Sequence, residues 1–260
     1  VTSGSGNIAG TNVSNVSVTC TTNTYTVSGT VSGNSGTVTL TNNGVDQQTV
    51  STLNGSFTFS PQNYGTNWSV AATGPVSQTC TVSGNGSGAN ITANVTNVVV
   101  TCTTKTFTVS GTISGNSGTV TLTNNGVDQQ TVSALNGSFT FSPQNYGTNW
   151  SVAATGPVSQ TCLVSNASGS NITANVTNVV VTCQNNTYTV GGTVTGLGTG
   201  LSVTLLNNGG NGITVNATGP LSFTFAPAQT TGSAYNVTVG TQPSGQTCTV
   251  TNGSGNVGTT

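Results

Sequence analysis

Apolar and polar residues alternate with a period of two along most of the chain. Between Tyr25 and Val31 every second residue is apolar or glycine, and the same alternation returns at Val38 and Leu40. Asn-Gly pairs follow such runs and suit the positive backbone angles of hairpin turns. No segment shows a helical period, so the sequence predicts about seven short strands in each unit, arranged as an antiparallel β-sandwich.

One run of residues is the most β-branched in the chain and marks the junction between units. It reads NVTNVVVTC at residues 94–102, recurs at residues 175–183, and appears as NVSNVSVTC at residues 12–20. Apolar side chains stand at both odd and even positions of this run, which predicts a strand that is packed on both faces. Which sandwich contains this strand decides how the chain can associate.

The run belongs to an internal repeat with a period of about 82 residues. Residues 26–80 and 108–162 are identical except for Val31 against Ile113 and a single Thr-to-Ala difference, whereas the third copy has diverged. We therefore expect an N-terminal linker or donor strand followed by three repeats, at residues 1–19, 20–101, 102–182 and 183–260.

A family resemblance lies in three strand and turn segments: TVSGTV at residues 26–31, VTL at residues 38–40 and NGSFTF at residues 54–59. They resemble the bacterial surface repeats of the carboxypeptidase-regulatory-like and Cna-B type, which are immunoglobulin-like sandwiches. The QTCTV and NVTNVVVTC segments resemble a cysteine-bearing variant found in tandem arrays of large exported proteins. The resemblance implies an all-β chain of three tandem immunoglobulin-like antiparallel β-sandwich domains. The Lys-to-Asn isopeptide bond of Cna-B domains is not expected, because Lys105 is the single lysine.

Charged residues are almost absent, with one Lys or Arg, two Asp or Glu, no His and a formal net charge of −1. Nucleic acid is therefore not an expected partner, since binding to phosphates needs a basic surface. No apolar run approaches the ~18 residues of a membrane helix, so membrane insertion is not expected. The chain begins at Val1 without a charged or apolar leader, and we expect that any secretion signal has been removed.

Candidate catalytic groups are equally scarce. General acid-base and nucleophilic catalysis need a group that titrates near neutral pH, and the chain has no His, no Glu and no paired carboxylates. Asp46 and Asp128 occupy equivalent positions, but one carboxylate per repeat cannot form a calcium site without many carbonyl ligands. We expect a non-enzymatic protein without cofactor or metal, in which these aspartates are solvated turn residues.

Two aromatic pairs are candidates for stacking on a sugar, Trp68 with Tyr64 and Trp150 with Tyr146. Each tryptophan alternates with Val and Ala in a predicted strand, and Tyr235 replaces it in the third repeat. Packing in the core is therefore the favoured interpretation of both tryptophans.

Asn-x-Ser/Thr sequons are numerous and could accept covalent glycans if the host has the enzymes. In a chain so rich in Asn, Ser and Thr, most of these tripeptides arise by chance. The candidate acceptors are Asn67, Asn90, Asn94, Asn149, Asn171, Asn175 and Asn236.

The cysteines occur as two per repeat, at Cys20, Cys80, Cys102, Cys162, Cys183 and Cys248. They predict disulfides formed in an oxidising, extracellular compartment. Metal ligation is disfavoured, because the chain has no C-x-x-C motif and no His. The favoured pairing closes each repeat, as Cys20–Cys80, Cys102–Cys162 and Cys183–Cys248. The alternative joins Cys80 to Cys102 and Cys162 to Cys183, and leaves Cys20 and Cys248 for a bond between neighbouring copies.

Two explanations compete for the β-branched run. If it opens its own repeat, all three sandwiches are complete, and the chain is a stalk segment of a large cell-surface adhesin. If it completes the preceding sandwich, the third repeat ends one strand short, and residues 12–19 of another copy would supply that strand. We favour the second explanation, which predicts a pilus-like extracellular bacterial filament, a homopolymer assembled head to tail. The assembly residues would be Asn12, Val13, Val16 and Val18.

Stability is expected to depend little on pH, because few groups can change protonation between the folded and unfolded states. With one basic and two acidic side chains, the melting temperature should stay nearly constant between about pH 3 and pH 9. Circular dichroism melts across this range measure it, and a steep loss of stability in acid would contradict the expectation.

Overall fold

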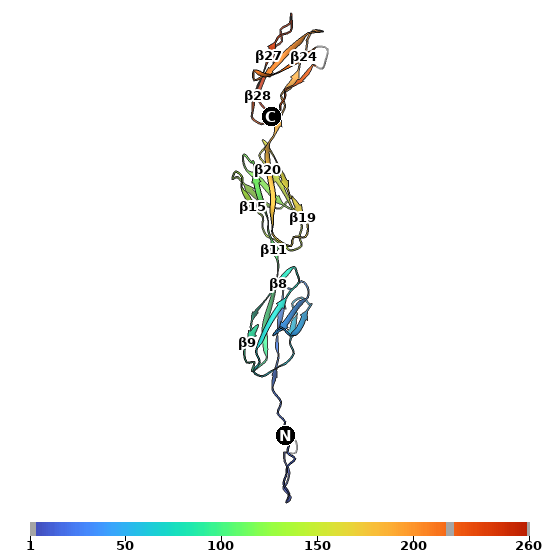
Figure 1. The fold of residues 1–260 in the computed structure, drawn as a ribbon, viewed down its shortest axis with the longest axis vertical. Coiled ribbons are helices and arrows are strands. Elements are labelled where there is room, and N and C mark those ends of the chain that lie inside the picture. The colour runs from blue at the N-terminus through green and yellow to red at the C-terminus, as the bar shows by residue number, and fades with distance from the viewer. Residues whose placement is uncertain (1–3, 217–220, 259–260) are drawn as a thin grey trace. The chain divides into compact units, whose positions relative to one another are not determined.

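A computed structural model describes residues 4–216 and 221–258. These residues form strands, turns and loops with no helix among them, and the predicted all-β fold is confirmed. No helix in this part of the chain could therefore cross a bilayer. The sheets are antiparallel as predicted, except where two strands pair parallel to a neighbour, β10 with β2 and β20 with β12. The chain divides into two compact units, Val1–Thr106 and Phe107–Thr260, which are described separately (Figure 1).

The first unit contains two four-stranded sheets. One has the strand order β5-β2-β10-β8 and the other β4-β3-β7-β9, while β1 and β6 form a two-stranded sheet. The strands are β1 (Thr24–Tyr25), β2 (Val27–Ser32), β3 (Val38–Asn42), β4 (Asp46–Val50), β5 (Ser56–Thr58), β6 (Gln62–Asn63), β7 (Trp68–Thr73), β8 (Gln78–Gly84), β9 (Ser87–Gly88) and β10 (Val95–Thr104).

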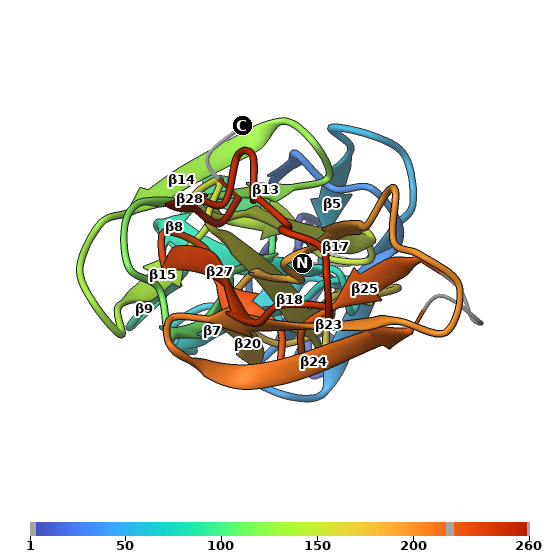
Figure 2. The ribbon, with the colours of Figure 1, turned by 90° about the horizontal axis from the view of Figure 1, so that it is seen from above.

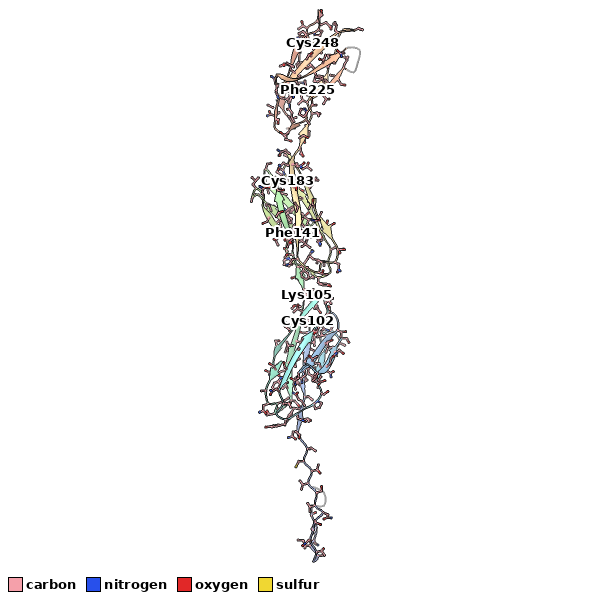
Figure 3. All side chains as sticks on the ribbon, in the orientation of Figure 1. Cys102, Lys105, Phe141, Cys183, Phe225 and Cys248 are labelled. Atoms are coloured by element: carbon pink, nitrogen blue, oxygen red, sulfur yellow. A yellow bond between two sulfur atoms is a disulfide. The ribbon has the colours of Figure 1, made fainter. Side chains whose placement is uncertain are left out.

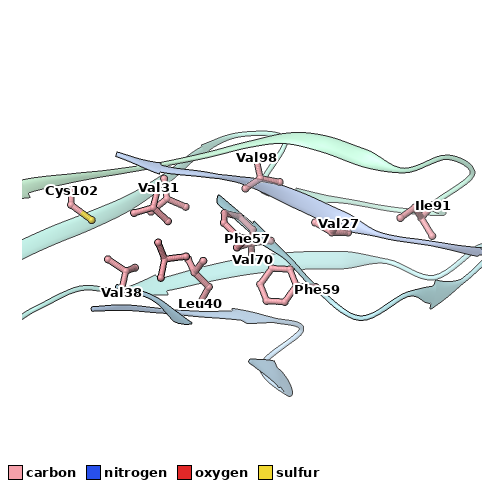
Figure 4. Packing of buried hydrophobic residues seen from close by; sticks show 12 residues of the cluster. Val27, Val31, Val38, Leu40, Phe57, Phe59, Val70, Ile91, Val98 and Cys102 are labelled. Atoms are coloured by element: carbon pink, nitrogen blue, oxygen red, sulfur yellow. The ribbon is translucent and has the colours of Figure 1, made fainter. Parts of the chain in front are cut away.

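Alternate side chains of these two sheets form the first core. Figure 4 shows Val31 and Val98 of one sheet opposite Leu40 of the other, and all three side chains are buried. Phe57 and Phe59 fill the space between the sheets, with their ring centroids 5.4 Å apart and nearly edge to face. Burial on alternate positions is what the predicted period of two requires.

The second unit begins with a second core of the same construction. Its sheets have the orders β15-β12-β20-β18 and β14-β13-β17-β19, and β11 pairs with β16. The strands are β11 (Thr106–Phe107), β12 (Val109–Ser114), β13 (Val120–Asn124), β14 (Asp128–Val132), β15 (Ser138–Thr140), β16 (Gln144–Asn145), β17 (Trp150–Thr155), β18 (Gln160–Ser165), β19 (Ser168–Gly169) and β20 (Val176–Asn185).

The third core lies in the remainder of this unit and has one four-stranded sheet, β24-β23-β27-β28, of which β23 and β24 are adjacent in Figure 2. Two further sheets have two strands each, β22 with β25 and β21 with β26. The strands are β21 (Thr187–Tyr188), β22 (Gly191–Thr193), β23 (Ser202–Asn207), β24 (Gly210–Asn216), β25 (Ser222–Thr224), β26 (Gln229–Thr230), β27 (Ala234–Thr241) and β28 (Ser254–Asn256).

The β-branched run completes the sandwich that precedes it in the chain. β10 lies between β2 and β8, parallel to β2 and antiparallel to β8, and β20 lies in the same way between β12 and β18. Within the chain, the favoured explanation of this strand is therefore confirmed. β10 also continues across the predicted boundary between residues 101 and 102, so the first sandwich extends past it. The division into three domains stays a prediction.

The prediction that this strand is packed on both faces is wrong. Val98 and Val100 of β10 are fully buried, whereas Val99 between them is 39% exposed. β20 repeats the pattern. The opposite sheet covers only one face of the strand, and valine at the other parity reflects the preference of β-branched residues for strands.

Gly29 of β2 lies against the backbone of the inserted strand. A Cβ at this position would meet the carbonyl oxygen of Val98, and Gly111 lies in the same way against Val179. The absence of a side chain at this position is thus a condition for strand insertion.

Gly29→Ala is expected to destabilise the first core by about 1–3 kcal/mol, because the added methyl group overpacks the contact with the inserted strand. Gly192→Ala is the matched control, since a Cβ on Gly192 meets only the ring of Phe223, at 3.1 Å. Differential scanning calorimetry of both variants as monomers measures the losses, and equal losses would contradict the role given to the inserted strand.

Candidate assembly site

Among the described residues of the third repeat, 183–216 and 221–258, no strand takes the place that β10 and β20 take in the other two. β22 pairs with β25 alone, although its counterpart β12 pairs with both β15 and β20. Residues 246–250 correspond to the start of β18 and form no strand in the described part of the chain. The sheet is open where its central strand would lie.

A cleft of about 810 Å³ takes the place of that strand. Val190 and Val194 line it on one side, and Cys248 and Val250 line it on the other; Cys248 is marked in Figure 3. Val194 is only partly buried, whereas its counterpart Val31 is buried under β10. Apolar positions that a central strand would cover are therefore accessible in the third repeat.

Two glycines of the third repeat keep room for a further strand. Gly192 stands at the position of Gly29. Gly196 has a φ of 72°, as Gly33 does. A Cβ on Gly33 would meet the carbonyl oxygen of Cys102, whereas nothing lies within 4 Å of a Cβ on Gly196. The backbone here has the form that accommodates the end of β10 in the first repeat.

Residues 12–20 carry the inward and outward pattern of β10. Val16 and Val18 correspond to the two buried valines of β10, and Ser17 corresponds to the exposed Val99. None of these N-terminal side chains belongs to the first core, and the first strand of the described chain is β1. The exposed valines are Val13, Val16 and Val18, at 57%, 51% and 66%.

Asn12 stands at the position of a side chain that fixes the start of the inserted strand. Asn94 Oδ1 accepts a hydrogen bond from the backbone N–H of Thr26 at 3.0 Å, and the second repeat has the same contact at 3.0 Å. Thr189 is the residue of the third repeat that corresponds to Thr26. The acceptor of this contact is therefore present in the N-terminal segment, and its donor is present in the third repeat.

The favoured cysteine pairing is wrong. The structure joins Cys80 to Cys102 and Cys162 to Cys183, with Cα atoms 4.0 Å apart in each pair. Insertion of β10 beside β8 places Cys102 directly opposite Cys80, and β20 does the same beside β18. Pairing within repeats would satisfy all six cysteines in one copy, but the inserted strands place Cys102 and Cys183 beside the cysteine of the preceding sandwich instead. The pairs that do not form are Cys20–Cys80, Cys102–Cys162 and Cys183–Cys248.

Cys20 and Cys248 are left as free thiols. Cys20 is exposed, and Cys248 is half-buried at the wall of the cleft. Across the described residues, no group of three or more potential metal ligands gathers around either of them. The two bonds within the chain are thus those of the alternative pairing, Cys80 with Cys102 and Cys162 with Cys183.

Sequence reasoning missed a glutamine that holds the cysteine segment in place. Gln78 Nε2 donates to the carbonyl of Gly33 at 2.8 Å, and Gln246 Nε2 makes the corresponding bond to Gly196 at 2.9 Å. A glutamine stands two positions before the cysteine in all three copies, and that repetition is the signal that could have revealed it. Cys248 is thereby positioned although its segment is not a strand.

The aromatic candidates pack in the cores, as the favoured interpretation predicted. Trp150 is buried in the second core, and Trp68 packs against the first. Tyr235 takes the same place against the third core. Tyr64 and Tyr146 pack near the aromatic residues of β1 and β11. These rings support the fold.

The two aspartates also have a structural role, and the prediction of solvated turn residues needs correction. Asp46 Oδ2 accepts a hydrogen bond from the backbone N–H of Ser60 at 2.7 Å, and Asp128 makes the same bond with Ser142. Both carboxylates are half-buried at the start of a strand.

All seven candidate glycan acceptors are exposed. Four of them also accept a backbone hydrogen bond through Oδ1, namely Asn67, Asn94, Asn149 and Asn175. Glycosylation stays a prediction.

No family model matches the chain, and no curated protein does. Among solved structures it is similar to the crystal structure of the pilus adhesin SpaC from Lactobacillus rhamnosus GG, at 14% identity and a TM-score of 0.24. The match covers 83% of this chain and 35% of SpaC, so the chain spans about a third of that protein. A likeness at this TM-score carries no argument, and the assembly site rests on the repeats themselves.

The monomeric chain is expected to carry two reactive thiols, because only Cys20 and Cys248 are unpaired. N-ethylmaleimide under denaturing, non-reducing conditions should add two labels per chain by intact mass, and six after reduction. Trypsin cuts after Lys105, the single basic residue, and should leave one label on each fragment. An unreduced chain without labels would restore the pairing within repeats.

Proposed function

We propose that the protein is a structural, non-enzymatic subunit of an extracellular bacterial filament. Residues 12–20 of one copy add as the central strand to the open sheet in the third repeat of the next copy. The observation that carries the proposal is that β10 and β20, with the same sequence pattern, fill the equivalent position in the two preceding repeats.

The donated strand fits the cleft by its side-chain pattern. In the register of β10, Val16 and Val18 face the third core, and Ser17 faces outward. Burial of each valine contributes about 1.5–3 kcal/mol. The main chain pairs with β22 on one edge and with residues 246–250 on the other, which supplies affinity that is independent of side chains. Val190 and Val194 would then be covered as their counterparts are.

In the proposed assembly the contact is head to tail, because the donor and the acceptor are different surfaces of the chain. The donor lies in the unit Val1–Thr106 and the acceptor in the unit Phe107–Thr260. Each copy therefore has one donor and one acceptor, and heterologous contacts of this kind extend into linear assemblies. A chain with a formal charge of −1 also lacks the charged side chains that normally keep sheet edges apart.

The proposed location is outside the cell or on its surface. Two disulfides within the chain indicate an oxidising compartment, since cytosolic thiols are kept reduced. The proposed partners are other copies of the same chain.

The double variant Val16→Asp, Val18→Asp is expected to remain monomeric, because an unpaired carboxylate in the third core costs several kcal/mol. Ser17→Asp is the matched control. Its side chain points outward in the proposed register, as Val99 does in β10, so it should assemble as the natural chain does. Negative-stain electron microscopy and sedimentation velocity distinguish filaments from monomers.

Circular dichroism melts of both variants should match those of the natural chain in its monomeric state, because the substituted residues are exposed in the monomer. Filaments that persist after removal of residues 1–19 would contradict strand donation. Natural chains that stay separate are the result expected of a stalk segment in a large adhesin, the other function considered for this sequence.

A further inference from the structure

We propose that Cys20 of one copy and Cys248 of the next form a disulfide that makes the filament covalent. The inference rests on the proposed strand donation and adds a bond to it. It starts from the two thiols that are free in the chain and from the position that each holds in its repeat.

The register of the repeats places these two cysteines opposite each other. Cys20 stands at the position of Cys102, and Cys248 stands at the position of Cys80. In the first repeat Cys102 lies directly opposite Cys80 and is bonded to it, and the second repeat has the same arrangement. A strand donated in this register brings the Cα atoms to the separation of the bonded pairs, 4.0 Å.

Two glutamines position Cys248 at the wall of the cleft. Gln246 is tied to Gly196 at 2.9 Å. Gln242 binds the backbone of Cys248 itself, since Nε2 donates to the carbonyl at 3.0 Å and Oε1 accepts from the N–H at 2.7 Å. The backbone groups of this cysteine are therefore satisfied before any strand arrives.

The hydrogen bonds between Gln242 and Cys248 leave the edge of residues 246–250 that faces the cleft available for pairing with a strand. A Cα separation of 4.0 Å marks Cys80 and Cys102 as a close, non-hydrogen-bonded pair. In such a pair the N–H and C=O of each residue point away from the partner strand. Those are the groups that Gln242 binds on Cys248, so the backbone of its two neighbours would pair with the donated strand.

Close to Cys248, the third repeat differs from the other two repeats at Gln242. Its counterpart is Gly74, and a Cβ on Gly74 would meet Sγ of Cys80. A sulfur bonded at Cys248 lies next to the side chain of Gln242, where the other repeats have none. Substitution of Gln242 therefore tests whether this side chain permits the bond.

The bond forms by thiol–disulfide exchange. The two Sγ–H groups lose two protons and two electrons as the Sγ–Sγ bond forms, and a low-molecular-weight disulfide or the disulfide of a thiol oxidoreductase is reduced to two thiols. The thiolate is the attacking species. Cys20 is exposed and is therefore the thiol that such an oxidant can reach before assembly.

The disulfide also selects the register. A slip of one residue would turn Val16 and Val18 outward and move the two sulfurs apart. The bond therefore forms only when the strand is correctly seated, and it then prevents the strand from leaving.

The test uses the full chain, purified under reducing conditions and assembled in a mixture of reduced and oxidised glutathione. Denaturing electrophoresis without reductant is expected to show a ladder in steps of 25.6 kDa that collapses to one band on reduction. The single variants Cys20→Ser and Cys248→Ser should each give one band, yet still form filaments in electron micrographs.

A mixture of the two variants before assembly gives the sharpest control. One chain then supplies only Cys248 and the other only Cys20, so a covalent dimer and nothing larger is expected. A covalent dimer from either variant alone would show that like cysteines bond to each other, and would overturn the proposal.

The remaining outcomes separate the disulfide from strand donation. Natural filaments that dissociate to single chains in denaturant without reductant would overturn the disulfide and leave strand donation intact. A ladder that appears only with Gln242→Gly would do the same, because the natural side chain would then block the bond. Absence of filaments from every chain would overturn strand donation, and the disulfide with it.

Discussion

In the first two repeats, one sheet of the sandwich is complete only because the β-branched strand lies between two of its other strands. In the first core that strand is β10, whose backbone pairs on both edges and whose buried valines close the space under β2 and β8. Backbone groups in a protein interior need such partners, and an apolar core needs a cover. Where the strand is present the core is closed, and in the third repeat, where it is lacking, a cleft opens. Disulfide pairing, glycine positions and the proposed mode of association follow from this constraint.

The period of two was sufficient to predict the all-β fold class, but it predicted about seven strands where β1 to β10 surround the first core. Asn43 and Gly44 also adopt the positive φ, 53° and 74°, that the predicted hairpin between β3 and β4 requires. The cysteine pairing could not be derived from spacing, because it depends on which sheet receives the β10 strand. Apolar residues at both odd and even positions of β10 wrongly predicted burial on both faces of the strand. Valine favours strands whether or not its side chain is covered, as the exposed Val99 shows. The cleft itself was predictable only as the consequence of a missing strand.

The scarcity of charge suits an architecture of shared strands. Charged side chains at sheet edges usually oppose pairing between molecules, and here one lysine and two aspartates are the whole complement. Lys105 Nζ donates to the carbonyl of Val76 at 2.9 Å, and both aspartates accept backbone hydrogen bonds. The few charges thus act within the fold. In the proposed assembly, the specificity of association comes instead from backbone register, from the alternation of inward valines and from the shape of the cleft.

The third repeat and the N-terminal segment have both diverged in sequence from their counterparts. The residues that one of them retains fit the residues that the other retains. The third repeat keeps Gly192, which leaves room for a carbonyl of an inserted strand, and it keeps Cys248 at the edge of the gap. The N-terminal segment keeps the inward Val16 and Val18 but has Ser17 where β10 has its exposed valine. In a segment that stayed exposed to water, nothing would favour apolar residues on one face over the other. The distinction matches burial of one face in a sheet, and in the proposed assembly the open sheet of the third repeat provides that place.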